Sequence, residues 1–156
     1  MTTGWRWVLI PAVVLAVAVV GVLGFDRWTV RQNRDIAIPP DDASPEEVVR
    51  TYLGAVDAHD CDTAADLWKS QSAASTWCDD VASLAKVKVG EAFPDDPASR
   101  TSGPDQEVVK VTVWFDLHRR PLDLDVSTDD GYRVWGYRLE RDDPSDPWRI
   151  VDQGVS

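Results

Sequence analysis

The only two cysteines of the chain lie in the stretch HDCDTAADLWKSQSAASTWC, which also contains one of the two histidines. In an oxidising compartment, Cys61 and Cys78 would close a loop of about 18 residues and stabilise the domain by roughly 3 kcal/mol. His59 and Asp60 add metal-ligand types, but no C-x-x-C or H-x-x-x-H spacing supports a metal site. The pair therefore predicts a disulfide in an extracytoplasmic domain, with no metal and no cofactor. Two unrelated buried thiols are the alternative.

Asp152 and His59 are the candidates for acid–base catalysis, which requires an ionisable side chain aimed into an apolar pocket. Asp152 shares strand parity with Trp148 and Ile150 and is expected to face inward from the last strand. His59 lies near the end of the first predicted helix, on the same face as Tyr52. No partner can be placed beside either residue, so the sequence assigns no catalytic pair. The structural alternative for Asp152 is an ordinary carboxylate at a strand end. The alternative for His59 is a favourable electrostatic interaction with the C-terminus of the helix.

An uncharged apolar segment, WVLIPAVVLAVAVVGVLGF, runs from Trp7 to Phe25. At about 1.5 Å per residue, a helix of this length spans nearly the whole ~30 Å hydrocarbon core of a bilayer. The alternative, a cleaved secretory signal, normally has a shorter apolar region of roughly 7 to 15 residues and a small-x-small cleavage site. We therefore predict a single-pass transmembrane helix over 7–25, preceded by a short N-terminal tail over 1–6.

Two observations on the orientation of this segment disagree. More arginines follow it than precede it, so the positive-inside count weakly favours a cytoplasmic C-terminal part. A disulfide requires the opposite orientation, because thiols stay reduced in the cytoplasm. We give the disulfide more weight and predict a cell-membrane protein whose C-terminal domain is extracytoplasmic.

Acidic side chains dominate the composition, since 27 Asp and Glu against 16 Lys and Arg give a net charge of -11. Such a surface repels nucleic acid and anionic lipid headgroups, so nucleic-acid binding is excluded as a function class. The carboxylates are dispersed as pairs rather than gathered in a long tract. This pattern indicates a solvated surface and not an acidic interaction tail.

Residues 26–43 lack strong periodicity and contain a Pro-Pro pair, which is typical of a stalk. The folded domain is predicted over 44–156 and begins with SPEEVVRTYLGAVDAHD. Ser44 is the expected N-cap of a first helix, and Glu47 completes a capping box before apolar residues at helical spacing.

Two shorter helices are expected after the first, from Asp62 to Trp68 and from about Ser75 to Ala85. The pattern then changes to period two in KVKVGEAF and EVVKVTVWFDLH, and GYRVWGYRLER and WRIVDQ supply two further strands. Helices followed by antiparallel strands indicate an α+β domain. We expect about three helices packed on a curved antiparallel sheet of about four strands.

Three features of the sequence carry a family resemblance: the capped helix and turn SPEEVVRTYLGAVDAHDCDTAADLW, a later W-C, and the closing strand DPWRIVDQG. Because these features occur in this order, the chain resembles the nuclear transport factor two-like superfamily over nearly all of 44–154. The resemblance implies the cone-shaped fold also used by ketosteroid isomerases and polyketide cyclases. More narrowly, the chain is similar to membrane-anchored extracytoplasmic bacterial members, and related anchored domains imply partners in envelope transport or secretion assemblies.

Aromatic side chains are expected in two places. Those on inward faces would fill the cone or, alternatively, line a ligand pocket. Trp114 has the opposite parity to the apolar face of its strand, so it is expected on the outer face of the sheet with Tyr132 and Val134. Such a patch commonly marks a contact surface, for a homodimer or an envelope protein, with local packing as the alternative. The inward set is Tyr52, Trp68, Phe115, Trp135, Tyr137 and Trp148.

These observations predict a membrane-anchored extracytoplasmic module that binds or scaffolds a partner, rather than an enzyme. Two alternatives stay open: an isomerase or dehydratase with Asp152 as its base, and a carrier that holds a small apolar ligand in the cone. Two convergent ionisable groups in the interior would favour the enzyme, an open apolar pocket the carrier, and a filled cone the scaffold. Analogy between folds cannot choose among them.

Overall fold

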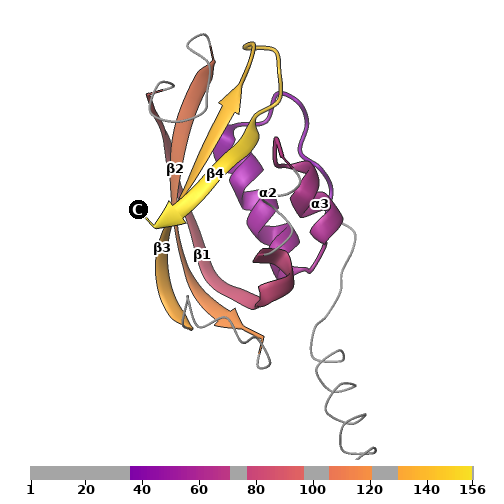
Figure 1. Cartoon of the computed structure of the whole chain (residues 1–156), viewed down its shortest axis with the longest axis vertical. Helices are drawn as coiled ribbons and strands as arrows, with labels where there is room; N and C mark the ends of the chain where they lie inside the picture. The colour runs from indigo at the N-terminus through magenta and orange to yellow at the C-terminus, as the bar shows by residue number, and fades with distance from the viewer. Residues whose placement is uncertain (1–35, 71–76, 97–105, 121–129, 156) are drawn as a thin grey trace, which may run out of the picture. The chain divides into compact units, whose positions relative to one another are not determined.

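In the computed structural model, helices pack against one face of a four-stranded sheet (Figure 1). The structure describes residues 36–70, 77–96, 106–120 and 130–155, all within one compact unit, Gln32–Ser156. The helices precede the strands along the chain, so the fold class is α+β. The elements in chain order are α2 (Pro45–Asp57), α3 (Cys61–Asp66), β1 (Val81–Pro94), β2 (Glu107–Arg119), β3 (Gly131–Arg141) and β4 (Arg149–Val155).

Capping interactions set both ends of α2. The Ser44 hydroxyl accepts a hydrogen bond from the Glu47 backbone N–H at 3.3 Å, which confirms the predicted N-cap. At the other end, His59 adopts a left-handed φ of 56°, and the Asp60 N–H donates to the Ala55 carbonyl at 2.8 Å. This closure satisfies a terminal carbonyl and turns the chain directly into α3.

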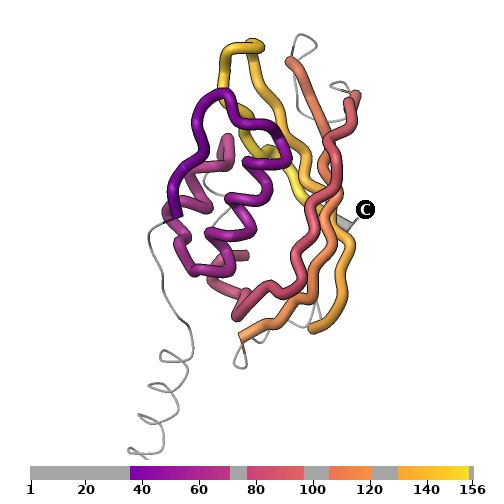
Figure 2. Tube along the Cα trace, turned by 180° about the vertical axis from the view of Figure 1, so that it is seen from behind, coloured from indigo at the N-terminus to yellow at the C-terminus, as the bar shows by residue number. Residues whose placement is uncertain are grey.

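The sheet is antiparallel throughout, in the order β1-β2-β3-β4. Its buried face follows from period-two alternation, because Val111, Val113 and Phe115 of β2 are at most 1% exposed. The register places Val111 opposite Tyr137 and Val113 opposite Trp135 of β3. Figure 2 shows the helices on this side of the sheet. We call this side the inner face and the opposite side the outer face.

The hydrophobic core lies between α2 and the inner face. Tyr52 of α2 is fully buried, and its ring meets those of Trp68 and Tyr137 edge-on, with centroids 6.0 and 5.4 Å apart. Burial of each such large side chain contributes about 1.5–3 kcal/mol. The core therefore centres on aromatic rings contributed by helix, loop and strand.

Side chains of α2 cover the free edge of β1. The carboxylate of Asp57 accepts from the Leu84 N–H at 2.6 Å, and that of Glu46 accepts from the Ala92 N–H at 2.7 Å. Burial opposes ionisation of Glu46, but hydrogen bonds led by that from Ala92 outweigh it and lower its pKa. Three register shifts also interrupt the pairing of β1 with β2. An edge with satisfied donors and bulges is a poor template for a further strand.

The predicted third helix, over Ser75–Ala85, is wrong. Only residues 77–80 are helical within the described part of that range, and β1 begins at Val81. Val81 and Leu84 are 1% and 7% exposed, and Leu84 pairs with Leu117 of β2. Pairing with a long neighbouring strand therefore outweighs the local helical pattern of a short segment.

The predicted fold is also corrected at its first element. Among the residues that the structure describes, no helix is long and apolar enough to cross a membrane. The expected transmembrane segment, Trp7–Phe25, and the tail before it lie outside those residues. Over the residues that the structure describes, the fold is therefore α+β, with helices α2 and α3 packed on strands β1 to β4.

Candidate functional site

The aromatic residues expected to fill or line the cone pack against the inner face. Trp135 is partly buried and packs on the core from β3, and Trp148 has the Arg141 guanidinium 4.5 Å from its ring centroid. Within the set, the Tyr52 ring contacts those of Trp68 and Tyr137, which is the close packing of a filled core. The other five members of the set are at most 6% exposed: Tyr52, Trp68, Phe115, Tyr137 and Trp148.

Several buried polar atoms of this core have no hydrogen-bond partner among the described residues. Gln153 lies opposite Tyr137 in register, and its Oε1 is one of them. A buried polar group without a partner costs about 1–3 kcal/mol, so an ordered water or a ligand oxygen here would relieve a penalty. The others are the hydroxyls of Tyr52 and Tyr137 and the indole N–H groups of Trp68 and Trp135.

Burial also dominates the electrostatics of the two inner tyrosines. It raises the pKa of Tyr137 well above its ordinary value of 10.0, and the neighbouring Tyr52 adds to that shift. Burial likewise raises the pKa of Tyr52. The indole N–H of Trp68 opposes the shift at Tyr52, although the two groups are not aligned as a hydrogen bond. Both hydroxyls are therefore neutral at physiological pH and act as hydrogen-bond donors or acceptors only.

Tyr137→Phe tests whether the buried hydroxyl is unsatisfied. We expect the free energy of unfolding to stay the same or to rise by up to about 1 kcal/mol, because the change removes a buried polar atom that has no protein partner. Urea unfolding at pH 7 measures it. Tyr132→Phe, at a tyrosine that is 63% exposed, is the matched control and should change little. A loss above about 1 kcal/mol for Tyr137→Phe alone would show that the hydroxyl has a bound partner.

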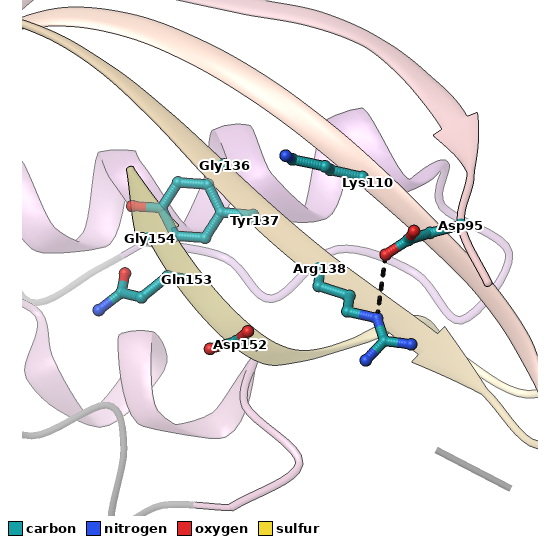
Figure 3. Close-up of a pocket in the computed structure, with 8 residues that line it drawn as sticks. All are labelled: Asp95, Lys110, Gly136, Tyr137, Arg138, Asp152, Gln153 and Gly154. Carbon is teal, nitrogen blue, oxygen red and sulfur yellow. Dashed lines mark ion pairs between the residues drawn. The ribbon is translucent and has the colours of Figure 1, made fainter. Parts of the chain in front are cut away.

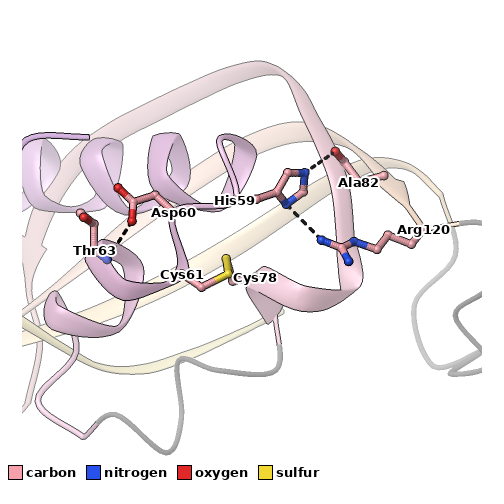
Figure 4. Close-up of a disulfide and its surroundings, with 7 residues drawn as sticks. All are labelled: His59, Asp60, Cys61, Thr63, Cys78, Ala82 and Arg120. Atoms are coloured by element: carbon pink, nitrogen blue, oxygen red, sulfur yellow. Dashed lines mark hydrogen bonds between the residues drawn. A yellow bond between two sulfur atoms is a disulfide. The ribbon is translucent and has the colours of Figure 1, made fainter. Parts of the chain in front are cut away.

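His59 is 5% exposed and is held between two groups that are not carboxylates (Figure 4). Its Nε2 lies 3.2 Å from the Ala82 carbonyl oxygen, and Nη2 of Arg120 lies 3.4 Å from its Nδ1. With Nε2–H donating to the carbonyl, Nδ1 accepts from the guanidinium. These contacts give His59 a role in closing α2 against β1, and they do not place it beside Asp152.

The predicted disulfide between Cys61 and Cys78 is confirmed, with Cα atoms 5.7 Å apart. It joins the start of α3 to residues 77–80, as Figure 4 shows. The neighbouring Trp77 stacks on Trp135 with centroids 5.9 Å apart and meets Phe115 edge-on. The disulfide therefore holds one aromatic of the core in place as well as the first turn of α3.

Asp152 lies on the outer face, contrary to the expected inward direction. Leu139 pairs with Ile150 while the adjacent Arg138 pairs with Asp152, so Val151 is an extra residue in β4. A bulge of this kind reverses the parity of all residues beyond it. The carboxylate proposed as a catalytic base is therefore directed away from the core.

Asp152 borders a hollow on the outer face, of about 110 Å³ (Figure 3). Gly136 lies opposite Gly154 in register, so this part of the sheet carries no side chains. Arg138, 6% exposed, forms an ion pair through Nε with Asp95 at 3.2 Å. Small-molecule pockets usually measure about 300–1,000 Å³, so this hollow suits one side chain better than a substrate. Its lining is Asp95, Lys110, Gly136, Tyr137, Arg138, Asp152, Gln153 and Gly154.

The residues expected to form a contact surface lie on the outer face beside this hollow. Trp114 pairs with Val134, and Tyr132, 63% exposed, is the next outward residue of β3. Nζ of Lys88 lies 5.4 Å from the Trp114 ring centroid. A Cβ on Gly90 would come within 3.1 Å of the same ring, so the glycine lets the indole lie close to the sheet.

Phe93 belongs to the same face and was missed by strand parity. It is 60% exposed and pairs with Lys110. In the sequence it shares parity with Val89, which packs against the core. A register shift between Val89 and Ala92 reverses that parity, and Gly90 within the shift is the one local signal for it. We refer to Phe93, Trp114, Tyr132 and Val134 together as the aromatic patch.

Comparisons with known proteins do not assign this site. No family model matches the chain, and no curated protein matches it. Among solved structures, a SEC-C motif containing protein from Rhodopseudomonas palustris aligns with a TM-score of 0.44 and 11% sequence identity, over 75% of this chain and 82% of that chain. A likeness at this level carries no argument, so the resemblance to the nuclear transport factor two-like superfamily stays a prediction.

Proposed function

We propose that the chain is an extracytoplasmic binding or scaffolding domain that docks a protein partner on the outer face of its sheet. The observation that carries this proposal is the aromatic patch, in which Phe93 and Tyr132 are 60% and 63% exposed. Large exposed aromatics are enriched at protein interfaces and uncommon elsewhere on soluble surfaces. Both described helices lie on the inner face, so neither covers the patch (Figures 1 and 2).

Two further features support docking on the face of the sheet. Carboxylates of α2 occupy backbone donors along the free edge of β1, which disfavours the addition of a partner strand there. The disulfide supports an extracytoplasmic location, because such bonds persist in oxidising compartments.

Site-specific photocrosslinking in cells tests the docking proposal. A photoreactive phenylalanine analogue at Tyr132 should give a discrete protein adduct, whereas the same analogue at the exposed Arg50 of α2 should not. Val134→Glu beside Tyr132 should reduce the adduct at least fivefold, because it places a charge within the patch. Equal adducts from positions 132 and 50, or an adduct that Val134→Glu leaves unchanged, would contradict the proposal. A mass of twice the chain would identify a second copy as the partner.

One observation favours a second candidate function, a carrier for a small ligand in the core. The hydroxyls of Tyr52 and Tyr137 and the Trp68 indole N–H offer hydrogen bonds that no described residue takes. A mainly apolar ligand with a single oxygen would meet both the rings and these donors. The stability change in Tyr137→Phe bears on this function, since a loss requires an oxygen of a ligand or of an ordered water at that hydroxyl, and no loss would count against the carrier. The isomerase or dehydratase alternative lacks its proposed base, because Asp152 faces outward.

A further inference from the structure

Most of the lysines of this acidic protein lie on the outer face of the sheet. Three of its four lysines lie on β1 and β2, at Lys86, Lys88 and Lys110. Lys88 neighbours Trp114 across the register, and Lys110 pairs with Phe93, so two of these lysines flank the aromatic patch. By contrast, the stretch 41–66, which forms the helix side, contains Arg50 as its one basic residue among eight carboxylates.

Within the described parts of the chain, two of these lysines have no acidic partner. Asp116 pairs with Lys86 at 2.8 Å, and Asp95 pairs with Arg138 at 3.2 Å. No carboxylate in the described parts of the chain lies within ion-pair distance of Lys88 or Lys110. Two exposed lysines beside exposed aromatics, with no carboxylate of the described residues paired to them, favour an acidic partner.

We propose that the patch binds an extended acidic segment of a partner protein, with two carboxylates placed about 13 Å apart. This inference rests on the proposed docking function. Lys88 lies opposite Trp114, and Lys110 comes four residues before Trp114 on β2. Four residues of extended strand span about 13 Å. Residues i and i+4 of an extended segment have that separation and point to the same side.

The partner residue midway between the two carboxylates would lie over the hollow on the outer face. Thr112 lies midway between Trp114 and Lys110 and pairs with Gly136, which itself pairs with Gly154. The hollow bordered by Lys110, Gly136 and Arg138 leaves room for one partner side chain beside Thr112. The recognised pattern is therefore acidic-x-x-x-acidic, read along one face of an extended segment, with the side chain of the middle residue over the hollow.

Titration of the full-length chain with three peptides tests this pattern. The probes are acetylated and amidated Glu-Ser-Phe-Ser-Glu, the same peptide with Gln for Glu, and the same peptide with Lys for Glu. The Trp114 indole N–H signal in a nitrogen-15 spectrum, assigned with Trp114→Phe, reports binding. At 0.15 M salt the screening length is about 8 Å, which limits repulsion from the acidic helix side. We expect the Glu peptide to bind about 5- to 20-fold more tightly than the Gln peptide, and the Lys peptide least tightly.

Variants that each remove one positive charge identify the lysines that bind the two carboxylates. Lys88→Gln and Lys110→Gln should each weaken the Glu peptide about two- to fivefold. Arg50→Gln, on α2, is the matched control and should leave its affinity unchanged. All three side chains are exposed, so the variants should melt as the parent does. Equal binding of the three peptides, tighter binding of the Lys peptide, or an equal effect of Arg50→Gln would overturn the inference. If the peptide titration fails but photocrosslinking at position 132 succeeds, only the acidic pattern is wrong. If the titration and the photocrosslinking both fail, the docking function is wrong.

Discussion

Removal of the Cys61–Cys78 disulfide is expected to lower the free energy of unfolding by about 3 kcal/mol. The bond closes a loop of about 18 residues, and on the chain-entropy model the open loop gains that much freedom in the unfolded state. For a unit of this size the loss corresponds to a fall in melting temperature of roughly 10 °C. The expected effect is a large fraction of the 5–15 kcal/mol that stabilises a typical domain.

The loss should concentrate where the disulfide acts. A helix as short as α3, Cys61–Asp66, is not stable by itself, so its start depends on the disulfide and on the Asp60 cap, which accepts from the Thr63 N–H. On the other side, residues 77–80 carry Trp77 against Trp135. Backbone amides of α3 and of 77–80 should therefore exchange with solvent faster than those of β2 and β3 once the disulfide is absent.

The double variant Cys61→Ser with Cys78→Ser, compared with the parent chain in reductant, measures this effect. Both should melt at the same lowered temperature, and reductant should leave the double variant unchanged. Thermal melts followed by circular dichroism and hydrogen exchange provide the two readouts. An unchanged melting temperature in the parent chain, after alkylation shows that both thiols are free, would contradict the prediction.

Local chemistry explains which parts of the fold were predictable. The start of α2 depends on Ser44 and Glu47, which lie three residues apart, so the sequence contains the whole interaction. The alternation of apolar residues from Val109 to Leu117 likewise predicts the inner face of β2. The four antiparallel strands and the Cys61–Cys78 pair were also predicted. The helix cap and the strand alternation depend on residues close in the sequence. The cysteines are distant from each other, but two cysteines allow only one pairing.

Features that depend on a neighbouring strand were not predictable in the same way. Asp152 faces outward because Val151 is an extra residue relative to β3, and Phe93 faces outward because of a register shift between Val89 and Ala92. A bulge exists only in relation to the partner strand, so parity counted along one strand cannot detect it. The candidate site was therefore predicted for Trp114, Tyr132 and Val134, whose strands pair in an unbroken register, and missed for Phe93.

Alkaline pH is expected to destabilise the unit steeply, through the two buried tyrosines. Burial raises the pKa of Tyr137 and of Tyr52 in the folded state above the value of about 10 that holds in the unfolded chain. Groups with raised pKa values stabilise fully below the unfolded pKa, and that contribution is lost as the pH rises above it. Above pH 10, the free energy of unfolding therefore falls by about 1.4 kcal/mol per pH unit for each tyrosine that stays neutral in the folded chain. For the two tyrosines together the fall is about 2.7 kcal/mol per pH unit.

Urea unfolding between pH 9 and pH 11.5 measures this slope, and Tyr137→Phe isolates its cause. The variant should lose stability with pH about half as steeply as the parent, because one ionisable group of the pair is gone. The pKa of Lys69 is also raised, mainly by its hydrogen bond to Glu140, and loss of that ion pair adds a term of the same sign. Lys69 is 43% exposed, so its term is small beside those of the tyrosines, and it is the same in parent and variant. Absorbance of tyrosinate near 295 nm should rise for Tyr52 and Tyr137 only together with unfolding. A slope that Tyr137→Phe leaves unchanged would mean that Tyr137 ionises in the folded chain, and therefore that water reaches the aromatic core, which would favour the carrier function over the filled scaffold.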